Sequence, residues 1–256
     1  MSNTRRIVLI VFSAIVVFSG FLIARFPANH ALALAAKLSE GMLTANNVSG
    51  TLWQGKADNI YVSYFNQSMD LGRTQWQLSF WPLLLGNVKV ELQADAGKQR
   101  IKTQLLASMS SLQLKDTEVN MDVARLMQFY PLPIDVQGRV ELLLQTAKLN
   151  QQGVEQIDGS IVLKDLAFTF QKSIELGSYA ARLSMDGEDV KADISDLDAN
   201  LTLEGYAKGN ISQRRYEADI NIKATEKTDD WIIQSLPMLA KKQADGSFLL
   251  QQSGNF

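Results

Sequence analysis

Apolar and polar residues alternate along most of the chain beyond residue 47. Residues 88–93 read Val-Lys-Val-Glu-Leu-Gln, so an extended backbone there has one apolar side and one polar side. This period of two is typical of antiparallel strands that are buried on one face. The same alternation recurs at 60–65, 75–80, 112–114, 140–144, 161–163, 166–170, 179–185, 190–194, 197–203 and 216–222. The pattern predicts a mainly β protein with about a dozen antiparallel strands.

The alternation also predicts which side chains lie together. In a strand of period two, every second residue points to the same face. We therefore expect one apolar face to carry Leu78, Val90, Leu142, Leu163, Leu183 and Ile220.

Glycine-containing pairs mark the expected turns, because glycine adopts positive φ angles at little cost. These pairs are Asp186–Gly187, Asp245–Gly246, Asp158–Gly159 and Gly86–Asn87. By the same reasoning, strands are expected to open at Gly138, Gly159 and Gly246.

Three segments have the composition of helices. Residues 28–40 are rich in Ala and Leu, and residues 122–130 place their apolar side chains on one helical face. Residues 229–242 begin with a capping Asp229, end on lysine, and contain Pro237, which should shorten or kink the helix.

Pro131 and Pro133 lie near the middle of the β region. They either join two halves of one sheet or separate two small domains, and we favour one continuous sheet. The apolar face then needs a cover. Two architectures remain open, a closed β-sandwich and an open, curved antiparallel β-sheet with an apolar groove, and we favour the curved sheet because wide twisted sheets curl.

The N-terminal segment differs from the rest of the chain. Residues 7–24 contain no charge, and as a helix they would span roughly 27 Å, close to the hydrocarbon thickness of a bilayer. Arg5 and Arg6 precede this run and predict a cytoplasmic N-terminus. A cleaved signal peptide is the alternative, but its small-residue site would come late, near residues 31–33.

We therefore expect a single transmembrane helix. The predicted organisation is a cytoplasmic tail at 1–6, a transmembrane anchor at 7–24, a membrane-proximal helical linker at 25–46 and an extramembrane β domain at 47–256.

Composition excludes many kinds of active site. The chain has no cysteine and one histidine, so disulfides, thiol nucleophiles and sites with two histidine ligands are impossible within it. The histidine, His30, is expected to be an interfacial residue beside the anchor. The acidic groups at 186–189, 193–198 and 229–230 are expected in solvated turns or on polar strand faces. We predict no catalytic, metal or cofactor site, and a net charge of −2 argues against nucleic acid as a partner.

The most distinctive motif is Gly-Thr-Leu-Trp-Gln-Gly at 50–55. It lacks the lysine and the following helix of a phosphate-binding loop, and it is better interpreted as a turn in which Trp53 is buried. The aromatic residues at 76–81 are expected in the core. The candidate structural or partner motif consists of Gly50, Thr51, Leu52, Trp53, Gly55, Trp76, Trp81, Pro82 and Gly86.

Several segments in this order resemble the type II secretion system protein N family. They are Val-Ser-Gly-Thr-Leu-Trp-Gln-Gly-Lys-Ala at 48–57, Trp-Gln-Leu-Ser-Phe-Trp-Pro-Leu-Leu-Leu-Gly at 76–86, Leu-Gly-Ser-Tyr at 176–179, Leu-Glu-Gly at 203–205 and Asp-Gly-Ser-Phe-Leu at 245–249. The resemblance runs from the anchor to about residue 254. It departs from the family at Trp81–Pro82, which compresses the segment before the leucine run.

The resemblance implies a single-pass protein of the inner membrane of a Gram-negative bacterium, with its bulk in the periplasm. It implies an accessory scaffold for the export of folded proteins, whose partners are other inner-membrane or periplasmic subunits and the membrane, through residues 7–24. The family is also similar to the curved sheets of AsmA-like proteins, so the alternative function is a trough that binds lipid or another apolar ligand. No cofactor and no enzymatic activity are expected.

Overall fold

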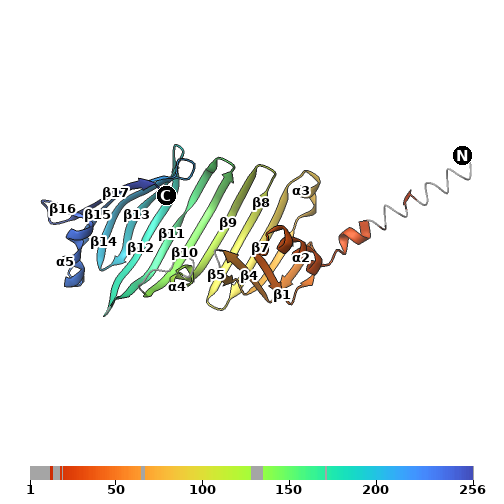
Figure 1. Ribbon diagram of the computed structural model, residues 1–256, viewed down its shortest axis with the longest axis horizontal. Helices are drawn as coiled ribbons and strands as arrows, with labels where there is room; N and C mark the ends of the chain where they lie inside the picture. The colour runs from red at the N-terminus through yellow and green to blue at the C-terminus, as the bar shows by residue number, and fades with distance from the viewer. Residues whose placement is uncertain are drawn as a thin grey trace, which may run out of the picture.

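The computed structural model describes residues 12–13, 18, 20–64, 67–127, 135–170 and 172–255. Antiparallel strands make up most of it, so the prediction of a mainly β protein is confirmed (Figure 1). The predicted tail at 1–6 and most of the predicted span at 7–24 lie outside the described residues. No helix within the described ranges is long and apolar enough to cross a membrane.

The larger sheet is a long row of fourteen strands in the order β16-β17-β15-β14-β13-β12-β11-β10-β9-β8-β7-β6-β3-β2. Its strands are β2 (Ser49–Gly50), β3 (Gln54–Ala57), β6 (Arg73–Leu78), β7 (Val88–Ala96), β8 (Gln99–Ala107), β9 (Ser111–Asp122), β10 (Asp135–Asn150), β11 (Gly153–Phe170), β12 (Lys172–Asp186), β13 (Asp189–Ala199), β14 (Leu201–Asn210), β15 (Arg215–Ala224), β16 (Lys241–Lys242) and β17 (Phe248–Asn255).

A smaller sheet of three strands lies near the β6 end of this row. It has the order β1-β4-β5 and contains β1 (Leu43–Asn46), β4 (Asn59–Tyr64) and β5 (Gln67–Asp70). The helices are α2 (Ala28–Leu38), α3 (Phe80–Leu84), α4 (Val123–Leu126) and α5 (Asp230–Leu239).

The large sheet continues past the proline-containing segment. Strands β9 and β10 pair directly, with Val140 opposite Met121 and Leu142 opposite Val119. Pro131 and Pro133 themselves lie outside the described residues. Within the described ranges, the large sheet has no second sheet of comparable size facing it, so its architecture is the single-layer alternative and not the sandwich.

One face of the large sheet is mainly apolar, although Thr103, Thr117 and Asp196 also lie on it. Strand pairing places Leu78 opposite Val90, Leu142 opposite Ile161 and Leu163 opposite Val140, and the same register continues across β12–β15. The prediction of a shared face is therefore confirmed for Leu78, Val90, Leu142, Leu163, Leu183 and Ile220.

The apolar face is covered most fully at the C-terminal end of the sheet. There α5 packs Ile232 and Leu236 against Leu201, Ile222 and Phe248, which are all buried. A second cluster, around Met121 and Val140, includes Val123 of α4. In the middle of the sheet, Leu142, Ile161 and Leu163 keep intermediate exposure.

The prediction of a turn at Asp158–Gly159 is wrong. Both residues lie inside the 18-residue strand β11, where Asp158 pairs with Thr146 and Gly159 with Leu144. The register slips by one residue between Leu144 and Thr146, which is a β-bulge. A Cβ at position 159 would lie 2.4 Å from the carbonyl oxygen of Leu143, so this glycine permits close strand approach rather than a reversal of the chain. Gly138 likewise lies within β10, at another bulge, and does not open the strand.

Three expected element boundaries also differ. The strand expected over 75–80 ends at Leu78, and Phe80 begins α3. Pro82 is tolerated there because first-turn N–H groups have no partner within the helix.

The helix expected over 229–242 ends at Leu239, after Pro237, and the two lysines form β16. The expected cap is present, since the Asp229 carboxylate accepts a hydrogen bond from the Trp231 N–H. α4 covers only the start of the helix expected over 122–130, and residues 128–130 lie outside the described ranges.

Candidate functional site

The 50–55 motif forms a tight hairpin turn between β2 and β3. Gly50 pairs with Gly55, and the Thr51 N–H donates to the Gln54 carbonyl oxygen over 2.8 Å. Gly50 has a φ of +93°, and a Cβ there would lie 2.5 Å from that same oxygen. The turn therefore requires glycine at position 50.

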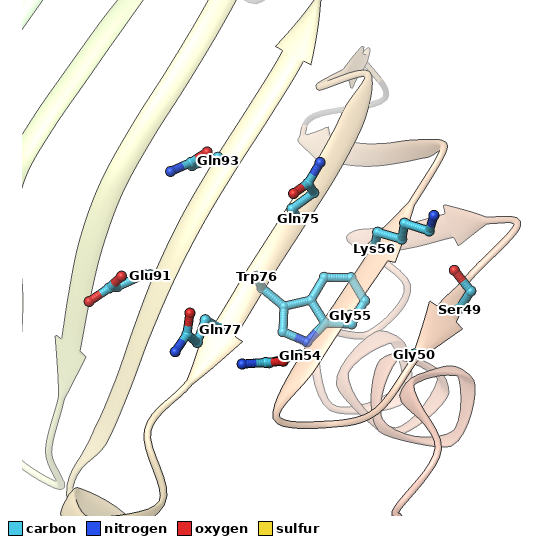
Figure 2. Close-up of a pocket in the computed structure, with 10 residues that line it drawn as sticks. All are labelled: Ser49, Gly50, Gln54, Gly55, Lys56, Gln75, Trp76, Gln77, Glu91 and Gln93. Atoms are coloured by element: carbon cyan, nitrogen blue, oxygen red, sulfur yellow. The ribbon is translucent and has the colours of Figure 1, made fainter.

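The second glycine of the motif makes room for a tryptophan ring. A Cβ at Gly55 would lie 2.2 Å from Cζ2 of Trp76, so the Trp76 ring lies directly on the Gly55 backbone (Figure 2). The Trp76 indole N–H donates to the Leu52 carbonyl oxygen over 3.1 Å. Together, the ring contact and the hydrogen bond fix the turn to β6.

The hairpin is also fastened to the N-terminal helical segment. The Trp53 indole N–H donates to the Ile23 carbonyl oxygen over 2.9 Å, and the Leu52 N–H donates to the Phe26 carbonyl oxygen over 2.8 Å. Pro27 and Thr51 form an isolated antiparallel bridge. Three consecutive turn residues thus hold the chain where it leaves the N-terminal segment.

α3 completes an aromatic group on this side of the sheet. The Phe80 ring meets the Trp53 ring edge-on, with centroids 5.3 Å apart, and it meets the Trp81 ring at 5.8 Å. The helix ends at Leu84, and Gly86, two residues later, has a φ of +74°, which suits the turn after a helix C-terminus. We call Trp53, Phe80 and Trp81, together with helical residues 20–24, the aromatic junction.

The structure thus brings the predicted motif residues into two neighbouring groups. Gly50, Thr51, Leu52, Trp53 and Gly55 form the hairpin with Trp76, and Trp81, Pro82 and Gly86 belong to α3 and its end. Phe80 links the two groups. The expectation that the aromatic residues at 76–81 lie in the core is wrong for Phe80 and Trp81, which are exposed, and Trp53 is half-buried rather than buried.

The opposite face of the same strands carries a polar depression of about 480 Å³. Its side chains are mostly neutral amides, which donate and accept hydrogen bonds without a net charge. They come from β2, β3, β6 and β7 and include Ser49, Gln54, Lys56, Gln75, Gln77, Glu91 and Gln93 (Figure 2). This face is suited to hydrogen bonding with another polar surface, and it presents no nucleophile paired with a base.

The acidic turn at 186–189 is bound by basic side chains. The Lys208 ammonium lies 2.6 Å from the Asp186 carboxylate, and its hydrogen bond and charge lower the pKa of Asp186 below its usual 3.8. Asn210 and Arg215 hydrogen-bond to the Asp189 carboxylate and lower its pKa in the same way. Among the described residues, no group of His, Cys, Asp and Glu side chains is arranged to hold a metal ion. Each of these ion pairs joins two strands that are separated by one other strand, β12 to β14 and β13 to β15, and we interpret them as structural.

Sequence reasoning did not predict the partner of Trp53. The acceptor is the backbone carbonyl of Ile23, thirty residues earlier, and a backbone acceptor leaves no trace in the side-chain pattern. His30 is exposed, with its ring centroid 6.3 Å from that of Phe26, beside the aromatic junction.

Comparison with known proteins adds an independent finding. Residues 42–251 match the family model described as type II secretion system (T2SS), protein N. The chain is 24% identical over 260 residues to the type II secretion system protein N of Vibrio cholerae serotype O1, with 96% of each chain covered. No solved structure matches the chain significantly.

Proposed function

Because this chain belongs to the type II secretion system protein N family, we propose that it is a periplasmic scaffold of the secretion apparatus, anchored in the inner membrane by residues 7–24. Family membership makes it a component of type II secretion. The scaffold role and the anchor are proposals. The observation that supports them is the set of hydrogen bonds between the 50–55 hairpin, at the edge of the sheet, and the N-terminal helical segment.

These hydrogen bonds restrict rotation of the sheet relative to the N-terminal helical segment. Two backbone acceptors, at Ile23 and Phe26, receive hydrogen bonds from the 50–55 hairpin. A freely tethered domain would need no such contacts, because a flexible linker alone would hold it at the membrane. The contacts therefore support a sheet held in a defined orientation to its anchor.

The sheet is long enough to reach far from that anchor. Strands in a sheet lie about 4.8 Å apart, so fourteen neighbouring strands extend over roughly 60 Å. Along this length the polar face displays amide and charged side chains to other subunits. An elongated platform fixed at one end is suited to positioning partners at a set distance from the membrane.

The sequence of residues 1–24 supports the anchor and its direction. The uncharged run at 7–24 matches the bilayer thickness, and Arg5 and Arg6 favour a cytoplasmic N-terminus. A reporter that is active only in the periplasm, fused after Phe256, should be active. Detection of a mature N-terminus near residue 33 would instead identify a cleaved signal peptide.

The scaffold role is tested by secretion and crosslinking in intact cells. A strain lacking this protein should release less of a type II cargo into the medium, and photo-crosslinkers at Gln75 and Gln93 on the polar face should capture other secretion subunits. A crosslinker at Lys227 is the control. Lys227 is exposed and lies near the far end of the sheet, so any protein that it captures is bound outside the polar depression. Normal secretion together with no captured subunit would overturn the proposal.

A lipid-binding trough is the second candidate, and one observation favours it. Leu142, Ile161 and Leu163 are only partly buried on the mainly apolar face of the sheet, and a contiguous apolar surface indicates an interaction site. Photo-crosslinkers at Val90 and Leu142 should then capture phospholipid. Leu143 is the matched control because it is the next residue along β10 and points to the opposite, polar face.

A further inference from the structure

We propose that the aromatic junction is itself a lipid-contact site, in which the α3 segment lies among the lipid headgroups and an apolar notch beside Trp53 receives an acyl chain. The inference rests on the proposed anchoring by residues 7–24 and extends it, because it assigns membrane contact to the β domain as well.

The α3 segment exposes an unusual amount of apolar surface. Trp81 is 77% exposed, Leu84 63% and Leu85 80%, and Phe80 is 44% exposed. These four large side chains fall within six consecutive residues, whereas single exposed apolar residues are common on any protein surface. No charged residue occurs between Leu78 and Val88. The segment therefore has the composition of an interfacial membrane contact.

The position of α3 indicates that its exposed apolar surface contacts the lipid bilayer. Phe80 packs on Trp53, and the Trp53 indole is hydrogen-bonded to the backbone of Ile23, so α3 is held beside residues 20–24. Those residues are helical and directly continue the uncharged run that starts at Ile7. A surface fixed to the last turn of a membrane span is at headgroup depth.

The residue types around the junction match that depth. Tryptophan is enriched where a membrane meets water, because its ring is apolar while its N–H needs a polar partner. Arg25 follows the apolar run, with its guanidinium carbon 5.4 Å from the centre of the Phe21 ring, and a cation there is suited to lipid phosphates. No acidic residue occurs before Glu40, so the N-terminal segment itself has no carboxylate that would repel anionic headgroups.

An apolar notch of about 400 Å³ lies between the helical segment and the sheet. Gly20, Ile23 and Ala24 form one wall, and the rings of Trp53 and Phe80 form the other. The one side-chain N–H among these residues, that of Trp53, is already donated to Ile23. A polar ligand would therefore lose hydrogen bonds on entering, whereas an acyl chain has none to lose.

Bromine atoms on lipid acyl chains quench a nearby tryptophan, so fluorescence of the full-length protein in vesicles tests the contact directly. The chain has four tryptophans, at 53, 76, 81 and 231. The vesicles contain phosphatidylcholine and phosphatidylglycerol, with the phosphatidylcholine either plain or dibrominated. The expected result is that Trp81→Phe removes a clear share of the brominated-lipid quenching.

Trp231→Phe is the matched control. Trp231 is also partly exposed but lies on α5, at the opposite end of the large sheet. Its replacement should leave the absolute intensity lost to quenching unchanged. Bromines near the glycerol end of the chain should quench Trp81 more strongly than bromines near the methyl end, because the contact is at headgroup depth.

Equal quenching in the parent and Trp81→Phe would overturn the lipid contact, as would loss of quenching only in Trp231→Phe. Vesicle flotation distinguishes this failure from that of the anchor. A protein that floats without Trp81 quenching keeps its anchor and lacks the aromatic contact, whereas a protein that does not float lacks both. Neither result alters a role in secretion, which is measured separately in cells.

Discussion

Replacement of Gly55 by alanine should destabilise the protein through one identifiable contact. The new Cβ would lie 2.2, 2.6 and 2.8 Å from three atoms of the Trp76 indole, all closer than real Cβ contacts allow. The indole is rigid and its N–H is held by the Leu52 carbonyl oxygen, so the whole ring must move. The strain therefore falls on the ring and on the hydrogen bond together.

The magnitude follows from these two effects. Crowding a packed site with an extra methyl group costs about 1–3 kcal/mol, and losing a hydrogen bond of this kind costs about 0.5–1.5 kcal/mol. We therefore expect Gly55→Ala to lower the free energy of unfolding by about 2–4 kcal/mol. Gly209→Ala is the matched control, since Gly209 is also a strand glycine without a positive φ, and its Cβ would lie 3.9 Å from the Arg215 carbonyl oxygen, which is an ordinary contact. That variant should be neutral or up to about 1 kcal/mol more stable, because alanine restricts the unfolded chain.

Urea unfolding of the full chain in detergent micelles, followed by circular dichroism, measures both variants. A double-mutant cycle with Trp76→Leu isolates the contact, because Gly55→Ala should cost much less once the indole is absent. If Gly55→Ala proves as stable as Gly209→Ala, the Trp76 ring does not lie on the Gly55 backbone and the reasoning fails.

Three further predictions concern the body of the sheet. Burial, with the nearby Asp196 carboxylate, raises the pKa of Tyr179 from 10 to about 12. The free energy of unfolding should therefore fall as pH rises from 10 to 12. Tyr179→Phe should remove this part of the pH dependence of urea unfolding. Because the pKa of Asp186 is lowered, its pairing with Lys208 stabilises the fold above pH 3.8, and this contribution is lost as pH falls through the folded-state pKa. The free energy of unfolding of Asp186→Asn should therefore be lower than that of the parent at pH 7 and equal to it in acid. Leu236→Ala should lower the free energy of unfolding by about 2–5 kcal/mol, because Leu236 is buried between α5 and the sheet, and an unchanged urea midpoint would show that α5 is not packed there.

The strand pattern was predictable because it depends on local alternation. Leu142 and Leu183 share a face with Ile220 in the structure, as their positions in period-two runs indicate. No long-range information is needed for this result. A sheet that is apolar on one side must bring those residues together whichever strands are neighbours.

The boundaries that were mispredicted depend on contacts between strands. Asp158–Gly159 has the composition of a turn, but β10 and β12 continue on both sides of it, and their pairing outweighs the local preference. The exposed state of Trp81 and the half-buried state of Trp53 were missed for a related reason. Aromatic composition indicates burial, but it does not distinguish burial in a protein core from an exposed position beside the N-terminal helical segment.

The order of the strands has a consequence for how the chain acquires its structure. From β7 to β14 every strand pairs with the strands immediately before and after it in sequence, so the pairing is built from hairpins whose loops close easily. Such a sheet grows by adding one strand at a time to an open edge while the chain emerges N-terminus first, much as repeat proteins propagate from unit to unit. The C-terminal end differs, because β17 pairs with β15 across an intervening segment that contains α5 and β16, and β16 pairs with β17. We therefore expect β17 to be added last, together with the cluster in which α5 packs on the sheet.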